Sequence, residues 1–210
     1  MKWVERMVSV ARRDAPELGL EAIYVAAGSD AARGAVVAPP HPLYGGSMDS
    51  PVVNEVAYAC FSAEMDTTRF NWRGVGASSG EPSGEAKDAD ADYGSALDHA
   101  ALGVPGKLVG CGYSFGAAAA VRVAGRHPRV KQLVLVAPPP ALISPDEIAA
   151  TGKEVLIVTG ADDDLAPAGA LQSALADSPG VEIVILPGTD HFFGRGLADL
   201  ARVTSTWLTR

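Results

Sequence analysis

The amino-acid sequence predicts an α/β fold in which helices cover both faces of a mostly parallel β-sheet. Apolar runs of strand length alternate with segments of helical periodicity from residue 34 onward. The longest irregular segments follow strands, where an open α/β sheet builds its site. The 210 residues are 48% hydrophobic and 20% charged, which suits a globular chain with a sizeable core. We therefore expect one domain spanning residues 1–210.

The predicted strands are short apolar runs bounded by Gly, Pro or Asp. Residues 4–11 and 20–27 precede the alternating part of the chain, and we expect them to form an antiparallel pair at one edge of the sheet. The continuous apolar run over 34–38 is typical of an inner parallel strand. The remaining predicted strands are 65–72, 107–111, 130–137, 155–159 and 181–186.

The first predicted helix begins at Ser50 and Pro51, a capping residue followed by the residue favoured at the first helical position. Its apolar residues at helical spacing are Val52, Val53, Val56, Ala57, Cys60 and Phe61. Residues 85–102 predict an acidic amphipathic helix. The residues expected on its inner face are Ala86, Ala89, Tyr93, Ala96 and Leu97. Further helices are predicted after Ser114, near residue 146, and over 168–176 and 197–208, whereas 73–84 predicts a long flexible loop.

Ser114 lies in the pentapeptide Gly112-Tyr113-Ser114-Phe115-Gly116, a G-x-S-x-G between an apolar run and an alanine-rich run. In a nucleophile elbow, the serine occupies a strained strand-to-helix turn that exposes its hydroxyl above the sheet. Flanking glycines let the backbone reverse without Cβ clashes. The N-terminus of the next helix then presents free N–H groups to an oxyanion. The alternative interpretation is an ordinary glycine-rich strand–helix turn.

A serine nucleophile needs a base, and the base needs an orienting carboxylate. His191 follows Ser114 and lies just after a predicted strand, in the chain order Ser, acid, His. The carboxylate is expected after strand 155–159, where Asp162, Asp163 and Asp164 are consecutive. Because Asp is also common in solvated turns, spacing alone leaves all three open.

Four segments together resemble small bacterial α/β-hydrolases related to dienelactone hydrolases and the serine aminopeptidase-like group. They are residues 40–48, 69–76, the pentapeptide around Ser114 and 190–193, and the likeness extends from about Val4 to Leu208. The resemblance implies a minimal α/β-hydrolase fold without a lid domain. It also selects Asp163, which follows the strand-end Gly160 by three positions, and it matches His191 to the family's base.

The same resemblance implies an oxyanion hole made by two backbone N–H groups. One is Phe115, and the other is Leu43, with Tyr44 as the second choice, since Pro42 has no N–H. Tyr44 and Phe192 are expected to contact the substrate.

Arg69, Asn71 and Arg73 stand at a strand end. They could bind a substrate carboxylate or tie a loop together, and we favour the second interpretation.

Composition narrows the partners that we expect. A net charge of −8 argues against nucleic acid and against an anionic membrane surface. The N-terminus shows no signal peptide and no spanning segment, so the expected location is the cytoplasm. Cys60 and Cys111 are expected to be buried free thiols. The sequence contains no metal cluster, phosphate loop or dinucleotide fingerprint, so we expect no cofactor and no metal.

These features predict a serine carboxylesterase that acts on small-molecule esters with short acyl groups. The segment between residues 137 and 155 is too short for a lid domain. A peptidase or thioesterase with the same Ser114, His191 and Asp163 remains an alternative, as does a catalytically silent hydrolase fold that binds a ligand. A homodimer whose partner covers the site also remains open.

Overall fold

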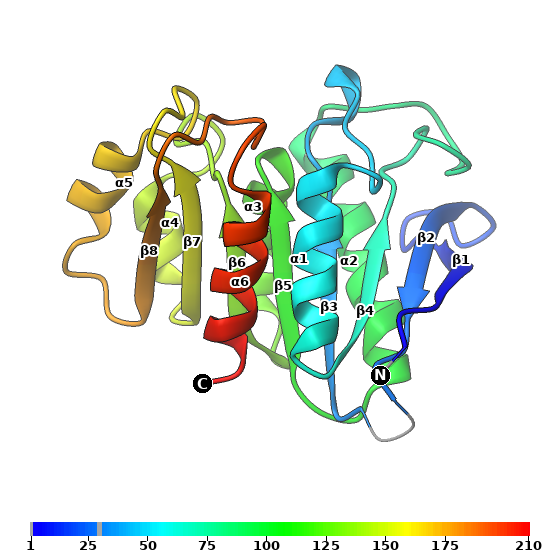
Figure 1. Cartoon of the computed structure of the whole chain (residues 1–210). Coiled ribbons are helices and arrows are strands. Elements are labelled where there is room, and N and C mark those ends of the chain that lie inside the picture. The colour runs from blue at the N-terminus through cyan, green and yellow to red at the C-terminus, as the bar shows by residue number, and fades with distance from the viewer. Residues whose placement is uncertain (1, 29–30) are drawn as a thin grey trace.

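The computed structural model describes residues 2–28 and 31–210. The chain forms an 8-stranded sheet in the order β1-β2-β4-β3-β5-β6-β7-β8 (Figure 1). The strands are β1 Glu5–Ala11, β2 Gly19–Val25, β3 Arg33–Ala38, β4 Met65–Phe70, β5 Leu108–Tyr113, β6 Val130–Val136, β7 Glu154–Gly160 and β8 Val181–Leu186. The β1–β2 and β2–β4 pairs are antiparallel and the other pairs are parallel. The predicted fold class and the antiparallel edge are confirmed.

Helices cover both faces of the sheet. Those described are α1 Pro51–Ser62, α2 Ala86–Gly103, α3 Phe115–Val123, α4 Pro145–Ala150, α5 Ala168–Leu175 and α6 Leu197–Leu208. Helices α1 and α6 pack together on one face, and α2 packs beside α3 on the other (Figure 1). Two details differ from the prediction. The Ser50 side chain makes no capping hydrogen bond, and Ala86 is exposed because it is the first residue of α2, one turn before the buried Ala89.

Strand β5 lies at the centre of the sheet between β3 and β6, and all its residues are buried. The chain order reverses at this point, since β4 lies beyond β3 on one side and β7 beyond β6 on the other. In open α/β sheets, ligands bind outside the carboxyl ends of the strands at such a switch point. Cys60 and Cys111 are buried free thiols, as predicted, with their Sγ atoms 3.8 Å apart.

The loop over residues 73–84, expected from the sequence to be flexible, makes hydrogen bonds along its length. Ser79 N–H donates to the Gly19 carbonyl at 2.8 Å. The Ser78 hydroxyl accepts from Glu21 N–H and donates to the Asn71 carbonyl, both at 2.9 Å. These partners lie on β2 and at the end of β4, far away in sequence, so a Gly- and Ser-rich composition could not reveal them.

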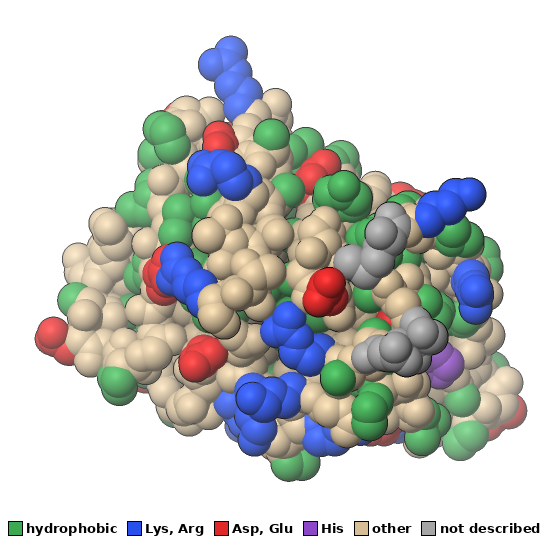
Figure 2. Space-filling view, turned by 60° about the horizontal axis from the view of Figure 1, so that its bottom comes forward, with side chains coloured by type: hydrophobic (Ala, Val, Ile, Leu, Met, Phe, Trp, Pro, Cys, Tyr) green, Lys and Arg blue, Asp and Glu red, His purple; other side chains and the backbone are tan. Residues whose placement is uncertain are grey.

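The carboxyl end of the sheet carries no lid among residues 2–28 and 31–210. Between β6 and α4 the chain makes only a short turn, in which Leu142 N–H donates to the Pro139 carbonyl. The opposite end of the molecule carries Lys and Arg side chains interspersed with acidic and apolar ones (Figure 2). Within the part of the chain that the structure describes, no helix combines the length and apolar character needed to cross a membrane.

Candidate active site

Ser114 occupies a strained turn between β5 and α3, with φ 53° and ψ −113°. Glycine is required on both sides because a Cβ on Gly112 would collide with the Gly116 carbonyl. A Cβ on Gly116 would collide with the carbonyls of Ala38 and Pro39 at the end of β3. The turn therefore packs tightly against the end of β3 and lifts the serine above the sheet, as the sequence predicted.

Three side chains from separate strand ends form one hydrogen-bonded chain. Ser114 Oγ lies 3.0 Å from His191 Nε2. On the other side of the ring, His191 Nδ1 lies 2.9 Å from Asp163 Oδ2 and 3.0 Å from Oδ1. The three residues follow β5, β8 and β7, so the parallel sheet brings them to one edge. The structure thus places together the three residues predicted from the sequence.

Asp163 differs from its two acidic neighbours in burial and in hydrogen bonding. It is 4% exposed, whereas Asp162 and Asp164 are exposed to solvent. Its Oδ1 accepts the N–H groups of Leu165 at 2.9 Å and Ala166 at 2.7 Å. Burial alone raises the pKa of the Asp163 carboxyl, but the hydrogen bonds from His191, Ala166 and Leu165 outweigh burial and lower its pKa below the ordinary Asp value.

The loop that carries His191 is held by Tyr113 and Phe193. The Tyr113 hydroxyl donates to the His191 carbonyl at 2.7 Å. Phe193 is 1% exposed and adopts φ 55°, a left-handed conformation unusual for an aromatic residue. Sequence reasoning missed Tyr113 because it occupies a variable position of G-x-S-x-G, and only the fold brings its hydroxyl to a loop 78 residues away.

The turn after β3 holds the backbone N–H groups of Leu43 and Tyr44 in hydrogen bonds to His41. Leu43 N–H donates to His41 Nδ1 at 3.2 Å, and Tyr44 N–H donates to the His41 carbonyl at 3.1 Å. Burial lowers the pKa of the His41 imidazole, which favours the neutral ring that can accept through Nδ1. In this structure both N–H groups are therefore bonded to His41, and the choice of Leu43, with Tyr44 as the second choice, stays a prediction.

The backbone N–H of Phe115, at the start of α3, and that of His41, in the turn after β3, differ from those of Leu43 and Tyr44. Among the hydrogen bonds of the described residues, none is donated by the backbone N–H of Phe115 or of His41. The two residues adjoin, with ring centroids 4.5 Å apart. The end of β3 leads directly into His41 and packs on Gly116. The Phe115 N–H, in the residue directly after Ser114, is therefore available as a backbone donor.

Tyr44 and Phe192 lie exposed around the site. Tyr44 is 87% exposed, with its ring 4.7 Å from that of His41. Phe192 is 75% exposed, and its ring stands perpendicular to that of His191 at 5.7 Å. Their expected contact with a substrate stays a prediction.

Arg69, Asn71 and Arg73 make structural contacts. Arg69 pairs with Glu5 at 2.8 Å, and the Asn71 amide bonds to Glu21 at 2.8 Å. Arg73 bonds to Asp92 at 2.8 Å. In the described part of the chain, none of the three bonds to Ser114, His191 or Asp163. This agrees with the preferred interpretation that they tie loops together.

The sequence profile described as serine aminopeptidase, S33, matches residues 42–160, more than half of the chain, including the turn around Ser114. The chain belongs to this family. The matched span ends before Asp163 and His191, so these two are located by the geometry of this structure rather than by the match. Together with the sheet order and the elbow, membership identifies the protein as an α/β-hydrolase.

Relatives of similar length share the whole fold. An α/β serine hydrolase homologue from Coxiella burnetii is 28% identical, with a TM-score of 0.83 over 99% of this chain and 98% of that one. An α/β serine hydrolase without a lid from Xanthomonas campestris is 25% identical, with a TM-score of 0.82 over 96% of this chain and 92% of that one. An uncharacterized protein from Rickettsia prowazekii is 28% identical over 205 residues, 92% of this chain and 85% of its own length.

Proposed function

We propose that this hydrolase is a serine carboxylesterase that acts on short-acyl esters of small molecules. The observation that carries the proposal is the continuous hydrogen-bonded chain from Ser114 Oγ through His191 to Asp163. The site lies at the carboxyl end of the sheet, and no lid covers it among the described residues. A base within hydrogen-bonding reach of the serine and a buried carboxylate on its other nitrogen are the arrangement that acyl transfer requires.

In the acylation step, Ser114 Oγ attacks the ester carbonyl carbon while its proton moves to His191 Nε2. The carbonyl electron pair moves onto oxygen, and the N–H group of Phe115, with a second N–H from the turn after β3, stabilises the resulting oxyanion. Asp163 holds the tautomer with a proton on Nδ1 and stabilises the imidazolium. The tetrahedral intermediate then expels the alkoxide, which takes the proton from His191.

In the deacylation step, His191 takes a proton from water, and the hydroxide attacks the acyl-Ser114 carbonyl. Collapse of the second tetrahedral intermediate breaks the ester bond to Ser114 Oγ. The serine recovers its proton from His191, and the carboxylic acid leaves. Tyr44 is exposed beside His41 and Phe192 is exposed beside His191, positions that suit contact with the acyl and alcohol groups.

Labelling with a fluorophosphonate probe, followed by hydrolysis of p-nitrophenyl esters, tests the proposal. We expect the wild type to be labelled and active, and Ser114→Ala to lose labelling and at least about 10⁴ in kcat. Ser173→Ala, an exposed serine on α5, is the matched control and should behave as wild type. An unlabelled, inactive wild type would favour a silent ligand-binding fold. Faster turnover of matched amides or thioesters would replace the ester assignment.

A further inference from the structure

Tyr113 connects the turn that carries Ser114 to the loop that carries His191. It is the last residue of β5, directly before Ser114, and its hydroxyl donates to the His191 carbonyl at 2.7 Å. The ring is 5% exposed, with its centroid 5.8 Å from that of the His191 imidazole and 6.1 Å from that of Phe193, edge-on. One buried side chain therefore links the backbone beside Ser114 to the backbone of His191.

The end of this link on β5 is fixed at the centre of the sheet. Tyr113 pairs with Val136 on the neighbouring strand β6, and Ser114 N–H donates to the Val136 carbonyl at 2.9 Å. On the other side, a Cβ on Gly116 would lie 2.5 Å from the Ala38 carbonyl oxygen, so the turn packs directly against the end of β3. The Tyr113 hydroxyl is thus presented from a backbone that is bonded in place.

The loop over residues 187–196, between β8 and α6, contains no helix and no strand. It is held instead by hydrogen bonds from its neighbours. Asp162 N–H, after β7, donates to the Thr189 carbonyl at 3.0 Å. The Tyr113 hydroxyl bonds to the backbone of His191 itself. The second bond therefore fixes the point in the loop from which the imidazole projects.

The Tyr113 hydroxyl is chemically suited to this contact because it stays protonated. Burial, together with the negative charges of Asp163 and Asp190, raises the pKa of the Tyr113 phenol above its ordinary value of about 10. An imidazole titrates near about pH 6.5, so the phenol keeps its proton throughout the range in which a histidine base works. A protonated phenol has one O–H to donate, and here the His191 carbonyl accepts it.

We propose that Tyr113 is a positioning residue that sets the location of the His191 imidazole relative to Ser114 Oγ. The proposal rests on the ester hydrolysis proposed above. The contact that it controls is the one between Ser114 Oγ and His191 Nε2, which are 3.0 Å apart. A misplacement of about 1 Å can cost about 10²-fold in rate. Because the hydroxyl is bonded to the carbonyl, Tyr113 acts through the His191 backbone and not through the imidazole.

The test compares Tyr113→Phe, which keeps the ring and removes the donor, with the wild type on p-nitrophenyl butyrate. We expect kcat to fall by about 10- to 100-fold, because the base is displaced from the serine. KM should stay within about two-fold, since the change affects proton transfer and not substrate binding. The rate constant for labelling by a fluorophosphonate should fall by a similar factor, because the probe reacts with the same activated hydroxyl. In place of Tyr113, para-aminophenylalanine still offers a donor and should restore most of the kcat.

Tyr93→Phe is the matched control. Tyr93, on α2, is 0% exposed, and its hydroxyl donates to the Cys111 carbonyl, also on β5, at 3.1 Å. The two variants therefore lose the same chemical group from a buried tyrosine bonded to a backbone carbonyl. Tyr93→Phe should unfold at a lower urea concentration than the wild type and should keep the wild-type kcat and labelling rate.

Should Tyr113→Phe fail to fold, para-fluorophenylalanine in place of Tyr113 fills the space of the hydroxyl and still removes the donor. Wild-type kcat and labelling rate in a folded variant that lacks the donor would overturn the inference. An equal loss of kcat in Tyr93→Phe would also overturn it, since the effect would then follow from lost stability. An inactive and unlabelled wild type would instead overturn the proposed function on which the inference rests.

Discussion

Asp163 is chemically distinct from Asp162 and Asp164, although the three are adjacent in sequence. Only Asp163 is buried and bonded to His191 Nδ1. We expect Asp163→Asn to lower kcat by up to about 10⁴, the scale found where loss of this carboxylate favours the wrong histidine tautomer. Asp162→Asn and Asp164→Asn should retain nearly full kcat. Steady-state kinetics on one ester measure kcat for the three variants. A large loss of kcat in Asp162→Asn or Asp164→Asn instead would show that the orienting carboxylate is that neighbouring residue.

The same carboxylate predicts a pH dependence of stability. The pKa of Asp163 is lower in the folded protein than in an unfolded chain, where an Asp titrates near about 4. Its contribution is therefore complete above that pH and is lost as the pH falls through the folded value. We expect the Tm of the wild type, relative to that of Asp163→Asn, to fall as the pH is lowered from about 6 to about 3. Asp162→Asn, scanned in parallel, is the control for loss of an exposed carboxylate from the same turn. A difference for Asp163→Asn that does not change with pH would contradict the prediction.

The sequence predicted Ser114 and His191 because each has a recognisable local context. Ser114 lies in a glycine-flanked turn, and His191 directly follows a predicted strand. It did not predict that the N–H groups of Leu43 and Tyr44 are bonded to the side chain and the carbonyl of His41. No spacing rule carries that information, because it is a property of one turn's internal hydrogen bonds.

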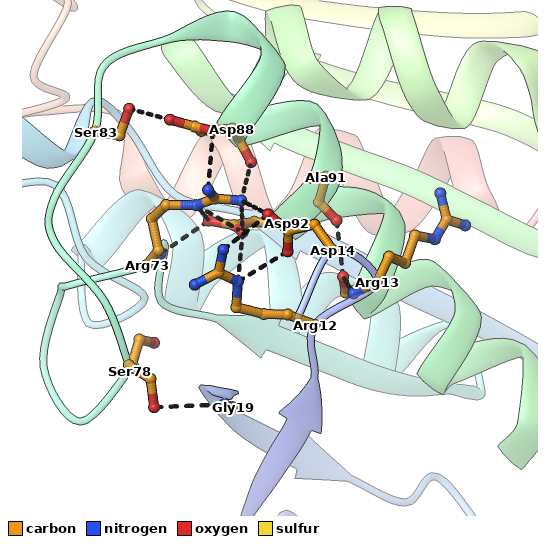
Figure 3. Close-up of polar contacts among 12 residues, drawn as sticks. Arg12, Arg13, Asp14, Gly19, Arg73, Ser78, Ser83, Asp88, Ala91 and Asp92 are labelled. Atoms are coloured by element: carbon orange, nitrogen blue, oxygen red, sulfur yellow. Dashed lines mark hydrogen bonds and ion pairs between the residues drawn. The ribbon is translucent and has the colours of Figure 1, made fainter. Parts of the chain in front are cut away.

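At the scale of elements, the cluster around Arg73 joins three segments that are far apart in sequence (Figure 3). Asp14 follows β1, Arg73 follows β4, and Asp88 and Asp92 lie on α2. Burial alone lowers the pKa of the Arg73 guanidinium, but the hydrogen bond and charge of Asp92, with the charges of Asp14 and Asp88, raise its pKa overall. Composition showed only an acidic helix and a glycine-rich loop, which is why the sequence suggested a flexible segment.

Removal of Asp92 should therefore weaken the whole fold. Asp92→Ala leaves the buried guanidinium of Arg73 without its main partner, and breaking a buried ion pair in this way costs about 3–5 kcal/mol of unfolding free energy. Urea unfolding measures the change. Asp199→Ala removes the exposed pair with Arg202 on α6 and should cost less than about 1 kcal/mol. Equal losses in the two variants would show that the buried cluster contributes no more than a surface pair.

At the scale of the molecule, the site lies at an open end of the sheet. His41, Ser114, Asp163 and His191 all follow carboxyl ends of parallel strands. The loops at this end expose apolar side chains: Leu43, Tyr44, Leu142, Leu165 and Phe192. Such a rim offers apolar contact close to Ser114 but, in the described part of the chain, no segment that folds over it.

This architecture predicts a preference for short acyl chains. Each methylene adds about 0.8 kcal/mol only while apolar surface remains to cover it. The turn between Ala137 and Ser144 is where a larger hydrolase would insert a cap, and here prolines and the Leu142–Pro139 hydrogen bond keep it compact. We expect kcat/KM for p-nitrophenyl esters to peak at roughly two to six acyl carbons and to fall beyond that.

The series should be measured below each substrate's micelle concentration and at two protein concentrations. A dimer covering the rim would lengthen the preferred chain as the protein concentration rises. Activity that keeps increasing to twelve carbons at both concentrations would contradict the open-cleft interpretation and favour a deeper groove lined by Phe192, Tyr44 and the loop over 74–84.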